Sequence, residues 1–158
     1  MSRFDARQWA RTLREHANPL VVAGDGCERI SLEGMPLLKV AVDLAGRLGA
    51  PVAATGNTLP AVRAMDGRLR AKKMWLAELH RFLEEKWEEP LLQERPDLLV
   101  TVGYRPELLQ GLAAGVRDLH VVHLGPGRLA PALLSMDEVP LAEWKQNLES
   151  LLRALERP

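Results

Sequence analysis

Four short turns contain the residues of this sequence whose types could bind an anionic ligand. Each turn follows an apolar run of strand length and consists of glycine and small or polar residues. Glycine lets backbone N–H groups approach a phosphate closely, and a helix that begins beside the turn adds a favourable dipole. The predicted ligand is a nucleotide, and its expected contacts are Gly24, Gly26, Thr55, Gly56, Asn57, Gly103, Tyr104 and Gly125.

The first turn, Gly24-Asp25-Gly26, does not complete a known nucleotide fingerprint. A dinucleotide loop needs a third glycine at position 29, where this chain has Arg29. The second strand ends in Thr55-Gly56, without the acidic residue that binds a ribose hydroxyl. A standard nicotinamide dehydrogenase is therefore disfavoured. Because strand-to-helix turns often need glycine for geometry alone, a purely structural role for each turn stays open.

The histidines and the cysteine give no clear catalytic or metal site. His120 and His123 are three residues apart on a predicted strand, so we expect their side chains on opposite faces. His80 and Glu84 are four residues apart and favour an ion pair on a helix. Cys27 is the only cysteine, and we expect a small packed side chain there. The sequence predicts neither catalytic nor metal-binding residues.

The elements that position the turns alternate between strands and helices. Strands are predicted at 20–23, 52–57, 97–103 and 120–125, with an edge strand at 133–136, and helices at 4–16, 35–48, 106–114 and from 140 onward. Such alternation predicts a single α/β domain over residues 1–158, with a mainly parallel sheet of five or six strands. The carboxyl ends of parallel strands meet at one edge, so all four turns are expected there.

Residues 58–89 are unusually charged, with basic residues first and acidic residues last. This order opposes the dipole of a single helix, which favours acids at its start. One interpretation is a solvated charged face. The other is a docking surface that includes Trp75 and Trp87, because tryptophan is enriched in the cores of interfaces.

Composition narrows the class of protein. Hydrophobic residues make up 47% of the 158 residues and the formal net charge is zero. These values are typical of a folded domain and disfavour a nucleic-acid-binding protein. No apolar run reaches the roughly 20 residues of a membrane span, and the first residues lack the apolar centre of a signal peptide. We therefore expect a cytoplasmic protein without membrane contact.

Three stretches together resemble a known family. Pro19-Leu-Val-Val-Ala-Gly24, Leu48-Gly-Ala-Pro-Val-Ala-Ala-Thr-Gly-Asn57 and Asp97-Leu-Leu-Val-Thr-Val-Gly-Tyr104 occur in the order seen in the epsilon subunit of the CO dehydrogenase/acetyl-CoA decarbonylase/synthase complex. The resemblance covers residues 15–125, and its Pro-x-Ala-Ala-Thr-Gly element is the most specific part. It implies a three-layer Rossmann-like fold, shared with deoxyhypusine synthase and called a DHS-like NAD/FAD-binding domain.

The resemblance implies a subunit without chemistry of its own in anaerobic one-carbon metabolism. In that family the nickel–iron–sulfur chemistry belongs to the catalytic alpha subunit, and the epsilon subunit binds beside it in a two-plus-two assembly. The implied cofactor is FAD, with a proposed role in electron transfer, and no metal in this subunit. A homodimer is a further expectation. The alternative is a free-standing flavin- or nucleotide-binding protein of the same fold.

Overall fold

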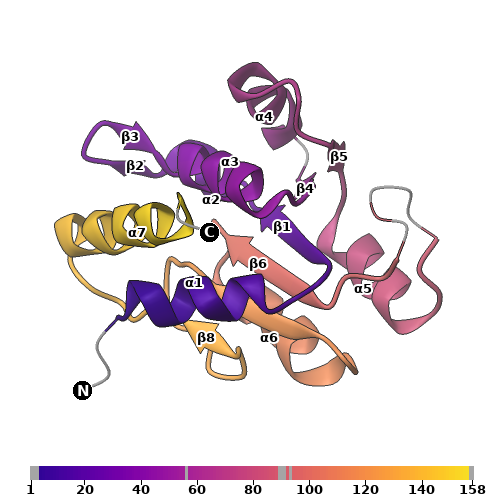
Figure 1. Ribbon diagram of the computed structural model, residues 1–158. Coiled ribbons are helices and arrows are strands. Elements are labelled where there is room, and N and C mark those ends of the chain that lie inside the picture. Colours follow the sequence, from indigo (N-terminus) through magenta and orange to yellow (C-terminus); the bar gives the residue numbers. More distant parts are fainter. Residues whose placement is uncertain (1–3, 56, 89–91, 93, 157–158) are drawn as a thin grey trace.

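A computed structural model describes residues 4–55, 57–88, 92 and 94–156 of the chain. Its centre is a six-stranded sheet in which every neighbouring pair of strands is parallel. The strand order is β5-β4-β1-β6-β7-β8 (Figure 1). The bounds of these strands are Pro19–Ala23 for β1, Val52–Ala54 for β4, Ala71–Lys73 for β5, Leu98–Val102 for β6, His120–His123 for β7 and Leu134–Ser135 for β8.

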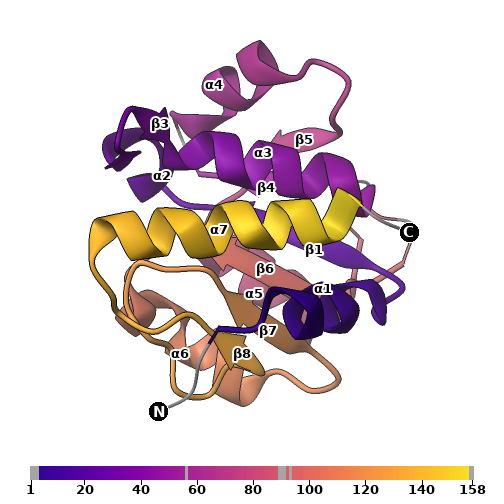
Figure 2. The same cartoon turned by 60° about the vertical axis from the view of Figure 1, so that its left-hand side comes forward.

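Helices cover both faces of the sheet and make the fold three-layered (Figures 1 and 2). On one face lie α1 (Ala6–Arg14), α3 (Leu37–Leu48) and α7 (Leu141–Glu156), and on the other lie α5 (Leu76–Glu84) and α6 (Pro106–Gly115). Side chains of β1 alternate between the two cores: Val21 faces the first, and Leu20 and Val22 face the second. The uninterrupted apolar sequence of β1 therefore reflects burial on both faces. The predicted three-layer α/β fold with a parallel sheet of five or six strands is confirmed.

The helix predicted at 35–48 begins two residues later than expected. Met35–Pro36 forms strand β3, which pairs with β2 (Ser31–Leu32) in a small antiparallel hairpin. The turn between them places Glu33 at φ 51° and Gly34 at φ 91°. At its other end α3 stops as predicted, because Gly49 adopts a left-handed conformation with φ 64°.

The charged segment that follows β4 is divided into three elements. The basic residues are spread over α4 (Thr58–Met65), the following loop and β5, and the acidic run begins at Glu84, the last residue of α5. The basic and acidic residues therefore do not lie on a single helix, and the unfavourable interaction with one helix dipole does not arise. Lys72 and Lys73 are exposed on β5, an edge strand, where lysine disfavours pairing with another chain.

Two short features complete the description. Helix α2 (Gly26–Arg29) begins in the turn after β1 and connects it to the β2–β3 hairpin. Across the described residues, every helix is too short or too polar to cross a membrane.

Candidate functional site

The predicted ligand contacts come from the carboxyl ends of four neighbouring strands. Strands β4, β1, β6 and β7 are adjacent and parallel, so the turns after them lie along one edge of the sheet. From β1 the chain continues outward to β4 and β5, and from β6 it continues the other way to β7 and β8. The gap between β1 and β6 is therefore the switch point at which such sheets usually bind ligands. Gly56 lies outside the described residues.

The turns after β1 and β6 pack directly against each other. The N–H of Gly24 donates to the carbonyl of Val102 at 2.9 Å, and the N–H of Gly26 donates to the carbonyl of Gly103 at 3.1 Å. A Cβ added to Gly24 or Gly26 would lie 2.5 or 2.6 Å from that Gly103 oxygen. Gly103 itself has φ +80°, and its added Cβ would meet Cys27 N at 2.7 Å. These glycines bring two backbones together, and their N–H groups point into the protein.

Tyr104 fills the space that remains at the switch point. Its side chain is 5% exposed, and its ring lies 2.9 Å from a Cβ built on Gly24. The hydroxyl donates a long hydrogen bond of 3.5 Å to the carbonyl of Ala23. Burial raises the pKa of Tyr104, so the phenol stays neutral. The crevice between β1 and β6 is occupied by the chain's own backbone and this ring.

The turn after β4 is different, because it contains buried hydroxyl groups. The Oγ1 atoms of Thr55 and Thr58 are both buried; Thr55 lies beside the Tyr104 hydroxyl, and Thr58 forms no hydrogen bond with any described residue. Thr58 opens α4 and is completely buried. Asn57 precedes it, and its side chain forms no capping hydrogen bond within the described residues. Thr58 was not predicted, because its burial depends on packing that no local pattern reveals.

Gly125, the last predicted contact, lies beside Gly103 and under α7. The N–H of Gly103 donates to the Gly125 carbonyl at 2.9 Å. Gly125 has φ +113°, and a Cβ there would be 2.9 Å from the Trp144 ring. The indole Nε1 of Trp144 donates to the Leu124 carbonyl at 2.8 Å. The adjoining cavity has a volume of 210 Å³, below the roughly 300 Å³ of small-molecule pockets.

The strand histidines are separated as predicted. His120 is exposed and contacts His16, with 2.9 Å between Nδ1 of His120 and Nε2 of His16. His123 is completely buried, and its Nδ1 lies 2.8 Å from Thr101 Oγ1. Burial lowers the pKa of His123 and keeps the ring neutral near pH 7.

Two further predictions, for Cys27 and for the pair His80 and Glu84, are confirmed. Cys27 is buried, its Sγ lies 3.4 Å from the Val102 carbonyl, and burial raises its pKa to about 12. A thiol in this state is a poor nucleophile. His80 and Glu84 form the predicted pair at 2.8 Å on α5. In the part of the chain that the structure describes, no three His, Cys, Asp or Glu side chains gather as metal ligands.

The two tryptophans of the charged segment have different environments. Trp75 is 54% exposed at the start of α5, and Lys73 Nζ lies 5.2 Å from its ring centroid. Trp87 packs against the core beside α5 and α6: its ring contacts Phe82 edge-on at 6.0 Å, and its Nε1 donates to the Leu92 carbonyl at 3.1 Å. Of the two, Trp75 has the exposure that a docking residue needs.

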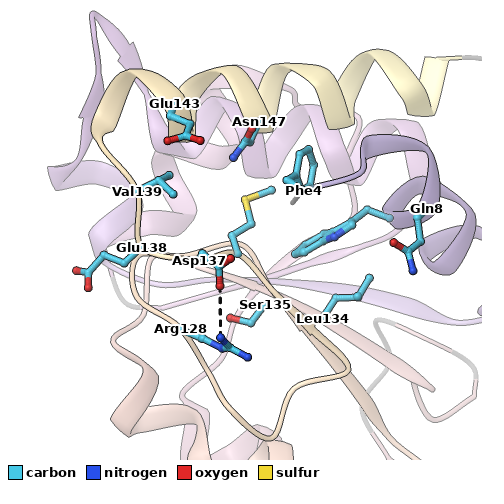
Figure 3. A pocket seen from close by; sticks show the side chains of 12 residues that line it. Phe4, Gln8, Arg128, Leu134, Ser135, Asp137, Glu138, Val139, Glu143 and Asn147 are labelled. Carbon is cyan, nitrogen blue, oxygen red and sulfur yellow. Dashed lines mark ion pairs between the residues drawn. The ribbon is translucent and has the colours of Figure 1, made fainter. Parts of the chain in front are cut away.

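A larger cavity, which the sequence did not predict, lies beside β8, the edge strand at the far side of the sheet from β5 (Figure 3). Its volume is 920 Å³. Residues from both ends of the chain line it: Phe4, Gln8 and Trp9 from the α1 region, and Glu143 and Asn147 from α7. The segment around β8 completes the wall with Arg128, Leu134, Ser135, Met136, Asp137, Glu138 and Val139.

Comparison with known proteins shows the fold. No model of a known protein family matches the chain, and no curated protein matches its sequence. An enzyme from Mycobacterium smegmatis, described as thiamin diphosphate-dependent, is similar in structure, with a TM-score of 0.53 and 18% identity over 92% of this chain. An alcohol dehydrogenase superfamily protein from Novosphingobium aromaticivorans has a TM-score of 0.42 and 21% identity over 89% of this chain. The chain spans 27% and 43% of these two proteins, respectively.

Proposed function

We propose that this chain is a non-catalytic accessory subunit of an anaerobic CO dehydrogenase/acetyl-CoA decarbonylase/synthase complex, bound to the nickel–iron–sulfur catalytic subunit. The observation that carries the proposal is the filled switch point. The N–H groups of Gly24, Gly26 and Gly103 all donate hydrogen bonds to backbone carbonyls of the chain itself. Tyr104 fills the space beside them. Because this crevice has no room for a cofactor, we expect the domain to act by binding another protein.

The resemblance to the epsilon subunit supports the same function. Two of the stretches that carry it, Pro19–Gly24 and Asp97–Tyr104, form the two strands and turns that pack together at the switch point. These residues therefore form the two central strands of the sheet and the turns that follow them. The catalytic subunit would supply the metal clusters, since one buried cysteine cannot bind a cluster by itself.

The docking residue that we propose is Trp75. It follows the edge strand β5, and the exposed Lys73 places its Nζ 5.2 Å from the centroid of the Trp75 ring. An exposed indole with a lysine beside it is suited to an apolar pocket with an acidic rim. Trp87 is excluded from this role because its ring and its Nε1 are engaged in the core.

The test is affinity capture of the catalytic subunit by the tagged chain after co-expression. Trp75→Ala should reduce the captured amount at least tenfold, because buried aromatic anchors at interfaces contribute about 2 kcal/mol or more. Leu108→Ala is the matched control: Leu108 is 58% exposed on α6, away from β5. Equal capture by wild type and Trp75→Ala would refute Trp75 docking, and no capture by wild type would refute the subunit function.

A free-standing flavin- or nucleotide-binding protein is the second candidate. The buried hydroxyl of Thr58, which has no partner among the described residues, favours it, since a phosphate at the start of α4 would satisfy this hydroxyl. The rest of the predicted contact set fits FAD poorly, because a ligand between β1 and β6 would have to displace Tyr104. Calorimetric titration of FAD into wild type and Thr58→Val distinguishes the candidates: heat that Thr58→Val abolishes supports binding, and no heat excludes it.

A further inference from the structure

Helices α1 and α7 lie side by side on one face of the molecule and border two cavities of opposite charge (Figure 2). The first is the 920 Å³ cavity of Figure 3, named here the acidic pocket for Asp137, Glu138 and Glu143. The second, named the basic groove, has a volume of 670 Å³, and its charged lining residues are Arg7, Arg11, Arg14 and Arg153 together with one acid, Glu15. One surface therefore carries two separate poles of charge.

The acidic pocket combines two exposed glutamates with apolar walls. Asp137 lies 3.6 Å from Arg128 and is partly neutralised by it. Glu138 and Glu143 are exposed and form no ion pair with any described residue. Phe4 and Trp9 meet edge-on at 5.2 Å in the wall. This combination fits the aliphatic stem and cationic head of an arginine side chain.

The basic groove has the complementary composition. Arg7 and Arg11 are exposed four residues apart on α1, and neither forms an ion pair with a described residue. Like charges at this spacing repel each other in the isolated chain. Across the groove, Arg153 of α7 contacts only an uncharged partner in the described structure, Ser150 Oγ at 3.2 Å. The floor between them consists of Ala6, Ala10 and Ala154, which leave room for long side chains.

We infer that a second copy of this chain covers this face, in a two-fold symmetric dimer. In such a dimer the same surface serves both subunits, so the acidic pocket of each copy meets the basic groove of the other. The symmetry would pair Glu138 and Glu143 with Arg7 and Arg11 in two identical contacts. Leu133 and Leu141, exposed by 44% and 45% beside β8 and at the start of α7, would supply apolar area.

The dimer leaves the proposed docking residue accessible. Trp75 follows β5, and the acidic pocket adjoins β8, and these strands are the two opposite edges of the sheet. The inference does not depend on the proposed function, because it concerns only the isolated chain.

The test measures the mass of the purified chain by analytical ultracentrifugation at low ionic strength. The measured mass of the wild type should be twice the 17.6 kDa of the single chain. Glu138→Lys/Glu143→Lys and Arg7→Glu/Arg11→Glu should each weaken self-association at least tenfold, since each places like charges against each other. An equimolar mixture of the two variants should restore the dimer, because the reversed charges are then complementary in both contacts.

The matched control is Glu85→Lys/Glu107→Lys, which reverses two exposed charges at the end of α5 and on α6, on the opposite layer. It should sediment like wild type. The mixture also separates loss of the interface from loss of folding, because misfolded variants would not recover a dimer. A monomeric wild type, a mixture that stays monomeric, or a control that dissociates equally would each overturn the inference.

Discussion

Replacing Gly26 with alanine tests whether the turns after β1 and β6 are in contact. Gly26 is the first residue of α2, and its backbone conformation suits alanine. The added Cβ, however, would lie 2.6 Å from the Gly103 carbonyl oxygen and 3.1 Å from its carbon. Because these atoms belong to the backbone, a side-chain rotation cannot relieve the clash. The two turns must move apart.

The expected loss of stability follows from this separation. Overpacking a core typically costs about 1–3 kcal/mol. Stretching the hydrogen bond from Gly26 N–H to the Gly103 carbonyl adds about 0.5–1.5 kcal/mol. We therefore expect Gly26→Ala to lower the free energy of unfolding by about 2–4 kcal/mol. For a chain of this size each kcal/mol corresponds to roughly 2–4 °C in melting temperature.

Urea denaturation followed by circular dichroism measures this difference, and Gly46→Ala provides the control. Gly46 lies inside α3, and no atom would be within 4 Å of its added Cβ. Alanine should stabilise that helix by about 0.5–1 kcal/mol. The two variants should therefore shift the urea midpoint in opposite directions. A Gly26→Ala protein as stable as wild type would refute the contact between the two turns and would favour a ligand site at the switch point.

Three further predictions concern buried side chains. Cys27 should react with a thiol reagent at mildly alkaline pH only after unfolding in urea, because its pKa is about 12; rapid labelling of the native protein would contradict its burial. The pKa of His123 is lowered by burial, so the unfolded chain binds the proton first and stability should fall as the pH drops below about 6.5; an NMR titration of His123 with a midpoint at or above that value would contradict this. Trp144→Phe should cost about 1–3 kcal/mol because it leaves the buried Leu124 carbonyl without its 2.8 Å donor, and a thermal melt that matches wild type would argue against that bond.

Local patterns were sufficient to predict strands β1, β4, β6, β7 and β8 and the edge on which their turns lie, but they missed β5 in the charged segment. The apolar run of β1 and the glycine that ends α3 carry their signals within a few residues. These patterns do not show which group packs against a glycine. Gly26 has the same sequence signal whether its neighbour is a phosphate or the Gly103 backbone, and only the pairing of β1 with β6 decides between them.

Features assembled from distant segments were not predictable from the sequence. Residues far apart in the sequence, such as Phe4 and Glu143, line the acidic pocket. The burial of Thr58 depends on the packing of α4 against its neighbours. The helix was predicted to begin at Met35, whereas pairing with Leu32 places Met35 in a strand. The tryptophans show the same limit, since identical residues at Trp75 and Trp87 have different exposure.

The central claim is that this chain acts by binding a catalytic partner and not by holding a cofactor at its switch point. Size-exclusion chromatography of the chain co-expressed with the nickel–iron–sulfur subunit, with light scattering and flavin absorbance recorded in line, tests it most directly. We predict that the two proteins elute together in a fixed ratio without flavin absorbance that follows this chain. Separate elution of the two proteins, with flavin accompanying this chain alone, would contradict the claim.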